Sequence, residues 1–385
     1  MIGATLAQLP RLLRYSFLSV SDSAYHQFSW QRLLVMLLFW PLFLFYLMLT
    51  AACLWLDHLL FPGFKKVTIK APVFVIGVPR SGTTFLHRLL AGDRERFTTM
   101  TLWELIFAPS ITQRRIWNGL AAVDAAVGKP CRQLLKWTED KAFAGLDGVH
   151  TTRLSDPEED YLALIPLLQC FLLVLPFGDP QFLQLARFDD TATPQQKYRL
   201  LNFYRSLMQR HLYVHGQHKT FLSKNPSFTP MLNTLALGFP DARFIACVRN
   251  PNQAVPSQVS SILVGARLFS GQVDTAWWRT HLMDMLVYYY QHLMSELPQL
   301  AQRQHYLVRM EQLAAEPQLT VNNIYRKLGL ESSPAYRDWL HMESDKARHY
   351  RSAHHYQGHQ LGIPAQTLMT KFQFVYQSMG YEAAE

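Results

Sequence analysis

A short glycine-containing turn, set between a strand pattern and a helix pattern, narrows the folds that this chain of 385 residues can adopt. The turn covers residues 77–84 and reads GVPRSGTT. Residues 73–76 before it are apolar and β-branched, as in a buried strand, and residues 85–91 after it fit a helix. Because a strand, a turn and a helix start aim backbone N–H groups at one point, we expect an anion to bind there.

The turn departs from the common nucleotide-binding loop at one position. Gly77 and Gly82 have the spacing of the G-x4-G-K-[ST] loop, but Thr83 stands where that loop has its lysine. Arg80, inside the turn, supplies the positive charge instead. The pattern therefore predicts a phosphorylated donor other than the usual substrate of an ATPase.

A second motif follows another strand pattern. Residues 242–248 fit a buried strand, Arg249 comes directly after it, and Ser257 lies near the start of the next expected helix. Arginine offers a planar fork to a terminal phosphate, and a serine hydroxyl adds a further hydrogen bond. Open α/β sheets bind ligands at the carboxyl ends of their strands, so both motifs should face one crevice. Two phosphate sites at two strand ends suit a nucleotide that is phosphorylated at two places.

Taken together, the motifs resemble those of sulfotransferases that use 3′-phosphoadenosine 5′-phosphosulfate (PAPS). The resemblance is greatest to a bacterial branch that shares motifs with tyrosylprotein sulfotransferases, and it covers roughly residues 70 to 380. It implies an α/β, P-loop-like three-layer fold with a mainly parallel sheet flanked by helices, PAPS as co-substrate, and no metal. The matching segments, in the order of the family, are Pro79–Thr84, Leu102–Glu104, Pro157–Asp160, Ser223–Pro226 and Arg249–Pro251 with Ser257.

The resemblance also implies which residues hold the donor. It assigns Arg249 and Ser257 to the 3′-phosphate, although a surface ion pair is the plainer interpretation of an arginine in such a place. The 5′-phosphosulfate is assigned to the turn, through Arg80, Ser81, Gly82, Thr83 and Thr84.

Three further residues are candidates for the chemistry of transfer. Lys224 follows a strand-like run and, by resemblance, reaches the bridging oxygen of the donor; a solvated lysine is the alternative. Glu104 occupies the Trp-Glu position that matches the acidic base of the family, and we expect it to take the proton of the acceptor. Glu159, in a Pro-Glu-Glu-Asp motif, is held in reserve, because paired acids after a proline are also an ordinary helix start.

An apolar segment near the N-terminus indicates contact with a membrane. Residues 33–56 carry no charge, and as a helix they would span about 36 Å, enough to cross a hydrocarbon core of about 30 Å. Pro41 lies inside the segment and favours a kink or a break. A transmembrane anchor is the favoured interpretation; an interfacial hairpin bent at Pro41 and a soluble buried helix stay open. Basic residues flank the segment on both sides, so its orientation is not determined.

The amino-acid composition indicates which classes of partner the protein can bind. Lys plus Arg outnumber Asp plus Glu by 37 to 28, for a formal charge of +9, which suits a polyanionic donor and an anionic membrane surface. We expect no nucleic-acid partner, because the sequence has no zinc spacing, RNA-binding signature or dense basic helix. The four cysteines lie far apart in the sequence and indicate buried thiols in a reducing compartment, with the catalytic domain facing the cytoplasm.

Strand patterns near residues 73–77, 220–223, 243–248 and 304–308 alternate with helix patterns and indicate a parallel sheet. We divide the chain into a membrane-associated segment, 1–66, and a sulfotransferase domain, 67–385. Within the domain, residues 93–219 are expected to form a helical insertion that builds the acceptor pocket. A basic and aromatic stretch, residues 346–356, resembles the C-terminal part of the family that can close over the nucleotide.

The sequence therefore predicts a membrane-associated sulfotransferase that modifies an acceptor hydroxyl. The apolar anchor beside an apolar insertion favours a lipid, sterol or glycolipid as acceptor. Two alternatives stay open: an ATP-dependent phosphotransferase, and a nucleotide-binding membrane scaffold without turnover. The missing loop lysine and the absence of a clear aspartate for magnesium at a strand end argue against the phosphotransferase.

Overall fold

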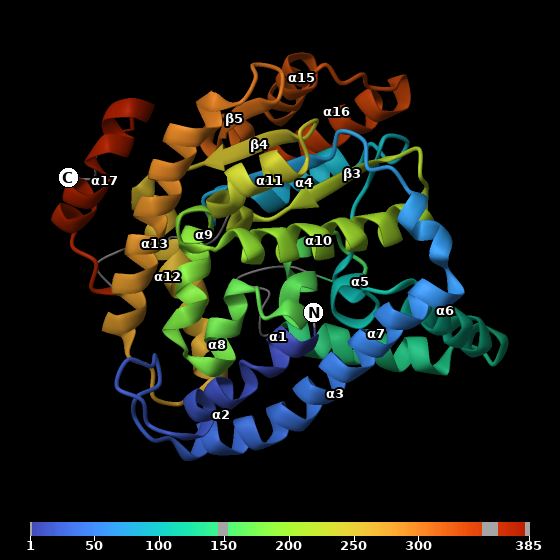
Figure 1. The fold of residues 1–385 in the computed structure, drawn as a ribbon. Helices are drawn as coiled ribbons and strands as arrows, with labels where there is room; N and C mark the ends of the chain where they lie inside the picture. The colour runs from blue at the N-terminus through green and yellow to red at the C-terminus, as the bar shows by residue number, and fades with distance from the viewer. Residues whose placement is uncertain (1, 145–152, 349–360, 382–385) are drawn as a thin grey trace.

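The computed structural model describes residues 2–144, 153–348 and 361–381 (Figure 1). The strands are β1 (Val73–Gly77), β2 (Phe97–Thr98), β3 (Thr220–Lys224), β4 (Arg243–Val248) and β5 (His305–Arg309). The α-helices are α1 (Ile2–Leu6), α2 (Leu9–Phe17), α3 (Trp30–Leu60), α4 (Thr83–Ala91), α5 (Leu102–Phe107), α6 (Ile111–Ala126), α7 (Pro130–Ala144), α8 (Val174–Phe177), α9 (Phe188–Thr191), α10 (Pro194–His215), α11 (Leu232–Gly238), α12 (Pro251–Phe269), α13 (Thr275–Glu296), α14 (Met310–Ala315), α15 (Pro317–Leu328), α16 (Pro334–Arg348) and α17 (Ala365–Met379). Short 3-10 helices are η1 (Pro62–Lys66), η2 (Asp160–Leu167), η3 (Phe171–Leu173), η4 (Pro180–Arg187), η5 (Pro226–Met231) and η6 (Leu297–Gln299).

The five strands form one parallel sheet in the order β2-β3-β1-β4-β5. In this register Val73 of β1 lies between Leu222 of β3 and Arg243 of β4. The turn after β1 and the Arg249 motif after β4 therefore leave neighbouring strands at the same edge. The parallel sheet expected from the sequence is confirmed, and the two-residue β2 is a strand that the sequence pattern did not indicate.

The two faces of the sheet enter separate apolar cores, as the alternation of side chains along a strand requires. Phe74 and Ile76 of β1 pack into the core shared with α10, α11, α12 and α13. Val73 and Val75 pack against α4, α15 and α16 on the other side. Figure 1 shows these layers, with α15 and α16 above the sheet and α10 and α13 below it. The expected three-layer arrangement is thus confirmed.

The N-terminal apolar segment is a continuous helix, α3, which runs through Pro41 without a break. Ser29 caps its start by accepting from the backbone N–H of Arg32 at 3.4 Å. One side of α3 packs on the rest of the protein through α2, α6 and α12, and buries Met36, Trp40 and Phe43. Among the single helices that the structure describes, α3 is long and apolar enough to cross a membrane by length and composition, and the segments Asp160–Leu167 and Phe171–Phe177 would be so only if the pair, bent by 60°, were taken as one span.

Charged residues near both ends of α3 are buried against the rest of the fold. The Asp57 carboxylate, fully buried, accepts from Arg210 Nε of α10 at 2.7 Å and from the backbone N–H of Thr112 at 2.8 Å. Near the other end, the Arg32 guanidinium donates to the carbonyl oxygens of Tyr15, Pro176 and Phe177 at 2.9–3.2 Å. Asp57 and Arg210 form a buried ion pair, and removing one partner of such a pair costs about 3–5 kcal/mol, while Arg32 joins the start of α3 to the fold through hydrogen bonds to backbone carbonyl oxygens.

Candidate functional site

The turn between β1 and α4 is shaped by close contact with β4. Gly77 has φ +138°, and a Cβ placed there would lie 2.1 Å from the carbonyl oxygen of Cys247. The backbone N–H of Val78 donates to that same oxygen at 2.9 Å. Arg80 is itself in the left-handed region, with φ +67°. Only glycine fits at position 77, and the turn is therefore held tightly against the strand that carries the second motif.

The two motifs expected to hold the donor meet directly. Arg80 Nε donates to the hydroxyl of Ser257 at 2.9 Å, and Arg249 Nη1 donates to the carbonyl oxygen of Arg80 at 3.1 Å. Burial lowers the pKa of Arg249, which the Glu311 carboxylate opposes. Two guanidinium groups at adjacent strand ends would gain most from a phosphate between or beside them.

The turn presents its glycine and threonines, but not its serine, to a cavity. Gly82, Thr83 and Thr84 line the cavity at the first turn of α4, where backbone N–H groups point outward. The Ser81 hydroxyl is fully buried and lies 2.9 Å from the carbonyl oxygen of Cys247. Ser81 therefore secures the turn to β4, and a hydroxyl contact from it to a donor would require the side chain to turn.

Lys224, at the end of β3, forms the centre of a buried charged cluster. Its ammonium nitrogen lies 2.9 Å from Glu158 Oε1, 3.3 Å from Glu159 Oε1 and 3.2 Å from Thr84 Oγ1. Burial alone would lower the pKa of Lys224, but the Glu159 and Glu158 carboxylates outweigh it and raise that pKa. The pKa of Glu159 is raised by burial, against the opposing charge of Lys224. A cation and two carboxylates thus stand beside the first turn of α4.

Asp160 helps to hold this charged cluster in position. Its carboxylate accepts from the Tyr204 hydroxyl and, at 3.0 Å, from the Ser223 hydroxyl next to Lys224. Burial raises the pKa of Asp160 to about 7, although both hydrogen bonds oppose the shift. The side chain ties the Pro-Glu-Glu-Asp segment to β3, which keeps Glu158 and Glu159 close to Lys224.

Glu104 lies in a different environment. Its carboxylate accepts from the backbone N–H of Thr101 at 3.0 Å, contacts His215 Nε2 at 2.6 Å, and lies 3.6 Å from Arg114 Nε. Burial alone would raise the pKa of Glu104, but Arg114 and the hydrogen bond from His215 lower it strongly. Of the residues in the described ranges, those that line the cavity do not include Glu104. The structure therefore brings Glu159, and not Glu104, to Lys224 and the turn.

His211 and His215 lie one turn apart on α10. Together with Glu104 they form a group whose possible ligand atoms all lie within 4.8 Å of one another, close enough to hold a metal ion. The guanidinium of Arg114 also lies 3.5 Å from His211 Nδ1. A permanent cation thus stands beside the carboxylate, and the group forms a polar network between α5, α6 and α10 in which Glu104 and His211 are buried and His215 is exposed.

The cavity measures about 1200 Å³ and has two chemically different parts. One part holds Arg80, Arg249 and the start of α4, with Glu158 and Glu159 beside it. The other part is apolar and comes mainly from η2, η3 and α12: Tyr161, Leu162, Phe171, Leu172, Ile262, Val264, Gly265 and Leu268. A charged end joined to an apolar chamber suits an anionic donor that meets an apolar acceptor.

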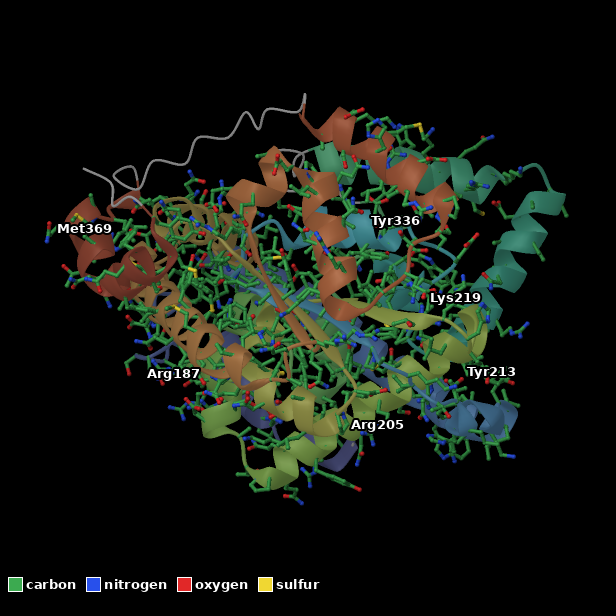
Figure 2. All side chains as sticks on the ribbon, turned by 90° about the horizontal axis from the view of Figure 1, so that it is seen from above. Arg187, Arg205, Tyr213, Lys219, Tyr336 and Met369 are labelled. Carbon is green, nitrogen blue, oxygen red and sulfur yellow. The ribbon has the colours of Figure 1, made fainter. Side chains whose placement is uncertain are left out.

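Residues far along the chain complete the wall, and the motifs did not indicate them. Met310 of α14 and Trp339 of α16 line the cavity, with Lys346 near its rim. The Tyr336 hydroxyl, labelled in Figure 2, donates to the carbonyl oxygen of Leu89 at 2.9 Å and so ties α16 to α4. Residues 349–356 of the basic and aromatic stretch lie outside the described residues.

Comparison with known proteins gives a consistent result. Residues 72–334 match the model of a sulfotransferase family. The chain is 26% identical over 279 residues to omega-hydroxy-beta-dihydromenaquinone-9 sulfotransferase Stf3 of Mycobacterium tuberculosis, a match that covers 71% of this chain and 66% of that protein. A curated relative of the same name from Mycobacterium bovis matches equally well. The aligned part thus spans slightly less than two thirds of these relatives.

Solved structures share the fold. Sulfotransferase STF9 from Mycobacterium avium superposes with a TM-score of 0.68 at 16% identity, over 86% of this chain and 82% of that one. Sulfotransferase STF1 from Mycobacterium tuberculosis superposes with a TM-score of 0.59 at 21% identity, over 83% and 81%. At these identities the likeness extends to the fold alone.

Proposed function

Because this chain belongs to the sulfotransferase family, we propose that it transfers the sulfuryl group of PAPS to a hydroxyl on a lipid-like acceptor. The observation that carries the proposal is that Arg80 and Arg249 line one part of a cavity that also has a largely apolar part, and that Arg80 is hydrogen-bonded to both Arg249 and the buried Ser257. The family disfavours the ATP-dependent phosphotransferase that the sequence left open.

We assign the donor to the edge where β1 and β4 end. Arg249 and Ser257 would hold the 3′-phosphate, since Arg249 lies between β4 and α12, Ser257 lies in the first half of α12, and both are hydrogen-bonded to Arg80. Arg80 with the backbone of Gly82, Thr83 and Thr84 would hold the 5′-phosphosulfate. The hydroxyl of Thr84 lies within reach of Lys224, so the phosphosulfate would be placed beside the charged cluster.

Transfer would then proceed in line. The acceptor oxygen forms a bond to sulfur while the bond between sulfur and the bridging oxygen of the donor breaks. Lys224, which is buried behind the cavity wall with its ammonium nitrogen 3.2 Å from the Thr84 hydroxyl, would stabilise that bridging oxygen, and the departing product would be adenosine 3′,5′-bisphosphate. Because the carboxylates raise the pKa of Lys224, it stays protonated for this role.

We assign the proton of the acceptor to Glu159. It lines the cavity, and its pKa is raised, which makes it a better proton acceptor at neutral pH than a carboxylate with a lowered pKa. Glu104 takes the role of a positioning residue, because its carboxylate is engaged by Thr101, His215 and Arg114. This assignment reverses the order in which the sequence ranked the two acids.

Two observations support a lipid-like acceptor. The curated relative from Mycobacterium tuberculosis is named for a hydroxylated menaquinone, which is a lipid. In this chain, leucine and phenylalanine side chains form the wall of the cavity beyond Glu159. Membrane association belongs to the same proposal and rests on the apolar helix α3. A catalytic site that faces the cytoplasm is proposed from the free cysteines, of which Cys53, Cys170 and Cys247 are buried as expected and Cys131 is exposed.

The proposal is tested with purified full-length protein, labelled PAPS and a panel of hydroxylated lipids, beside soluble phenols and sugars. We expect label to move to at least one lipid and adenosine 3′,5′-bisphosphate to bind more tightly than 5′-AMP. Arg249→Lys, which keeps the charge but loses the planar fork, serves as a matched control for Arg249→Ala. Equal binding of the two nucleotides by a folded protein would reject PAPS as the donor. Nucleotide preference without transfer to any acceptor would favour the non-catalytic scaffold.

A further inference from the structure

Helix α3 is attached to the rest of the protein along its whole length. Arg32 and Asp57 are buried near its two ends, about 38 Å apart along the helix axis. Between them Met36, Trp40 and Phe43 enter the same core as the sheet. A helix that crosses a bilayer must leave the soluble body at one end, and here that would break the buried contacts of Arg32 or of Asp57.

The opposite side of α3 is apolar and open to solvent. Leu38, Leu42 and Phe45 are 69%, 61% and 61% exposed, and their spacing places them on one stripe of the helix. The stripe is extended along α3 by Leu34, Met48 and Leu59 and ends near two exposed tryptophans, Trp30 and Trp55. Tryptophan is the residue type that concentrates at membrane interfaces.

The helices beside α3 continue this surface and add positive charge. Figure 1 shows α2, α3, α6 and α7 along one side of the molecule. On α6 and α7 the exposed apolar side chains are Ile116, Trp117, Leu120, Val123, Leu134, Leu135 and Trp137. The same two helices expose Arg115, Arg132 and Lys136, and the turn between them exposes Lys129. An apolar surface with basic residues beside it is complementary to anionic lipid.

The apolar end of the cavity reaches this surface. Leu268, at the end of α12, lines the cavity and is also 61% exposed. The next residue, Phe269, packs edge-on against Phe39 of α3, with ring centroids 5.9 Å apart. Gln31 of α3 also donates to the carbonyl oxygen of Arg267 at 3.1 Å. The wall of the chamber at Leu268 therefore lies next to the N-terminal half of α3.

We propose that α3, with α2, α6 and α7, is a monotopic docking surface that seats the protein on one leaflet and delivers a lipid acceptor to the apolar chamber. The docking stands on α3 and its neighbours, while delivery of the acceptor rests on the proposed function. A second copy of the chain is a poorer occupant, because a two-fold contact through this face would place the basic residues of α6 and α7 from both copies in one interface.

Binding is measured by flotation of the full-length protein with vesicles of phosphatidylcholine, with and without phosphatidylglycerol. We expect flotation, stronger with the anionic lipid, and a loss of about tenfold or more in Leu38→Glu/Leu42→Glu/Phe45→Glu. Leu237→Glu/Leu319→Glu, which alters exposed leucines of α11 and α15, is the matched control and should float like the parent. The docking surface would be overturned if all three proteins floated equally or if the parent did not float. It would also be overturned if the parent were a dimer and the triple variant a monomer.

Topology is measured with Gln27→Cys and Lys66→Cys, two exposed positions that flank α3, each introduced alone into a protein that carries Cys131→Ser in place of its exposed cysteine. A membrane-impermeant maleimide should reach both cysteines from the same side of sealed membranes; labelling from opposite sides would establish a span and overturn the proposal. Binding of adenosine 3′,5′-bisphosphate is followed in every variant. Normal nucleotide binding by a protein that fails to dock rejects the docking surface alone, while docking without nucleotide preference rejects only the proposed donor.

Discussion

Arg80 Nε and the Ser257 hydroxyl are joined by a hydrogen bond of 2.9 Å, although the two residues are 177 positions apart in the sequence. The bond crosses from the turn after β1 to the first half of α12. It places the two expected phosphate sites within one hydrogen-bonded unit, in which Arg249 also contacts the backbone of Arg80. Binding of a donor to one motif would therefore also affect the position of the other motif.

Replacing Arg249 with alanine should weaken binding of adenosine 3′,5′-bisphosphate by about 10- to 100-fold, because a charged hydrogen bond contributes about 1.5–3 kcal/mol. Binding of 5′-AMP, which has no 3′-phosphate, should change little. Calorimetry on both nucleotides checks this. Equal losses for the two would mean that Arg249 supports the turn rather than the 3′-phosphate.

Replacing Lys224 with methionine should lower the rate of transfer by about 100-fold or more and also lower the melting temperature. The variant keeps the length of the side chain but leaves Glu158 and Glu159 facing each other without a cation, at a cost of about 3–5 kcal/mol. Pairing it with Glu158→Gln separates the two effects. The double variant should recover stability and not activity; recovery of both would remove Lys224 from the chemistry.

Glu159→Gln should reduce kcat by about 10²- to 10⁴-fold, the usual contribution of a general base, while nucleotide binding stays near that of the parent. Burial raises the pKa of Glu159 above the ordinary glutamate pKa of 4.5. The activity of the parent should therefore be lost on acidification at a higher pH than that ordinary pKa would give. The pH profile of kcat/KM measures this. A variant with a parental profile would point to another base.

Glu104→Gln should act on stability rather than on the chemical step. The pKa of Glu104 is lowered in the folded state, so the ionised carboxylate contributes stability above its ordinary pKa of about 4.5, and this contribution is lost as the pH falls. The difference in melting temperature between parent and variant should therefore be large at pH 7, persist down to about pH 4.5, and shrink only as the pH falls below that value. A large loss of kcat with unchanged stability would restore Glu104 as the base.

Local sequence was sufficient to predict those parts of the site that are formed by a few adjacent residues. The turn with Gly77 and Gly82, and Arg249 after a buried strand, could be placed at strand ends because parallel strands share an edge. Their roles toward a donor stay predictions. The sheet followed from four strand patterns, whereas β2 is too short for any period to be recognised.

Other features depend on contacts between distant residues. The Trp-Glu match did not reveal that Glu104 points to Arg114 and His215, although Thr101 three residues earlier is a capping-box signal that ties up its carboxylate. Pro41 favoured a break in the apolar segment, yet α3 continues through it while packed against neighbouring helices. The pairing of Asp57 with Arg210, 153 residues away, has no local signature at all.

That last pair bears on how the chain can be shortened. A protein that begins at residue 67 would keep the donor turn, Lys224 and both carboxylates, and would fit the family match. It would also leave the buried Arg210 guanidinium without its anion and expose the side chains that Trp40 and Phe43 cover. The first 66 residues are thus an integral part of the folded core rather than a detachable anchor. Removing them to gain solubility should leave a protein that does not fold.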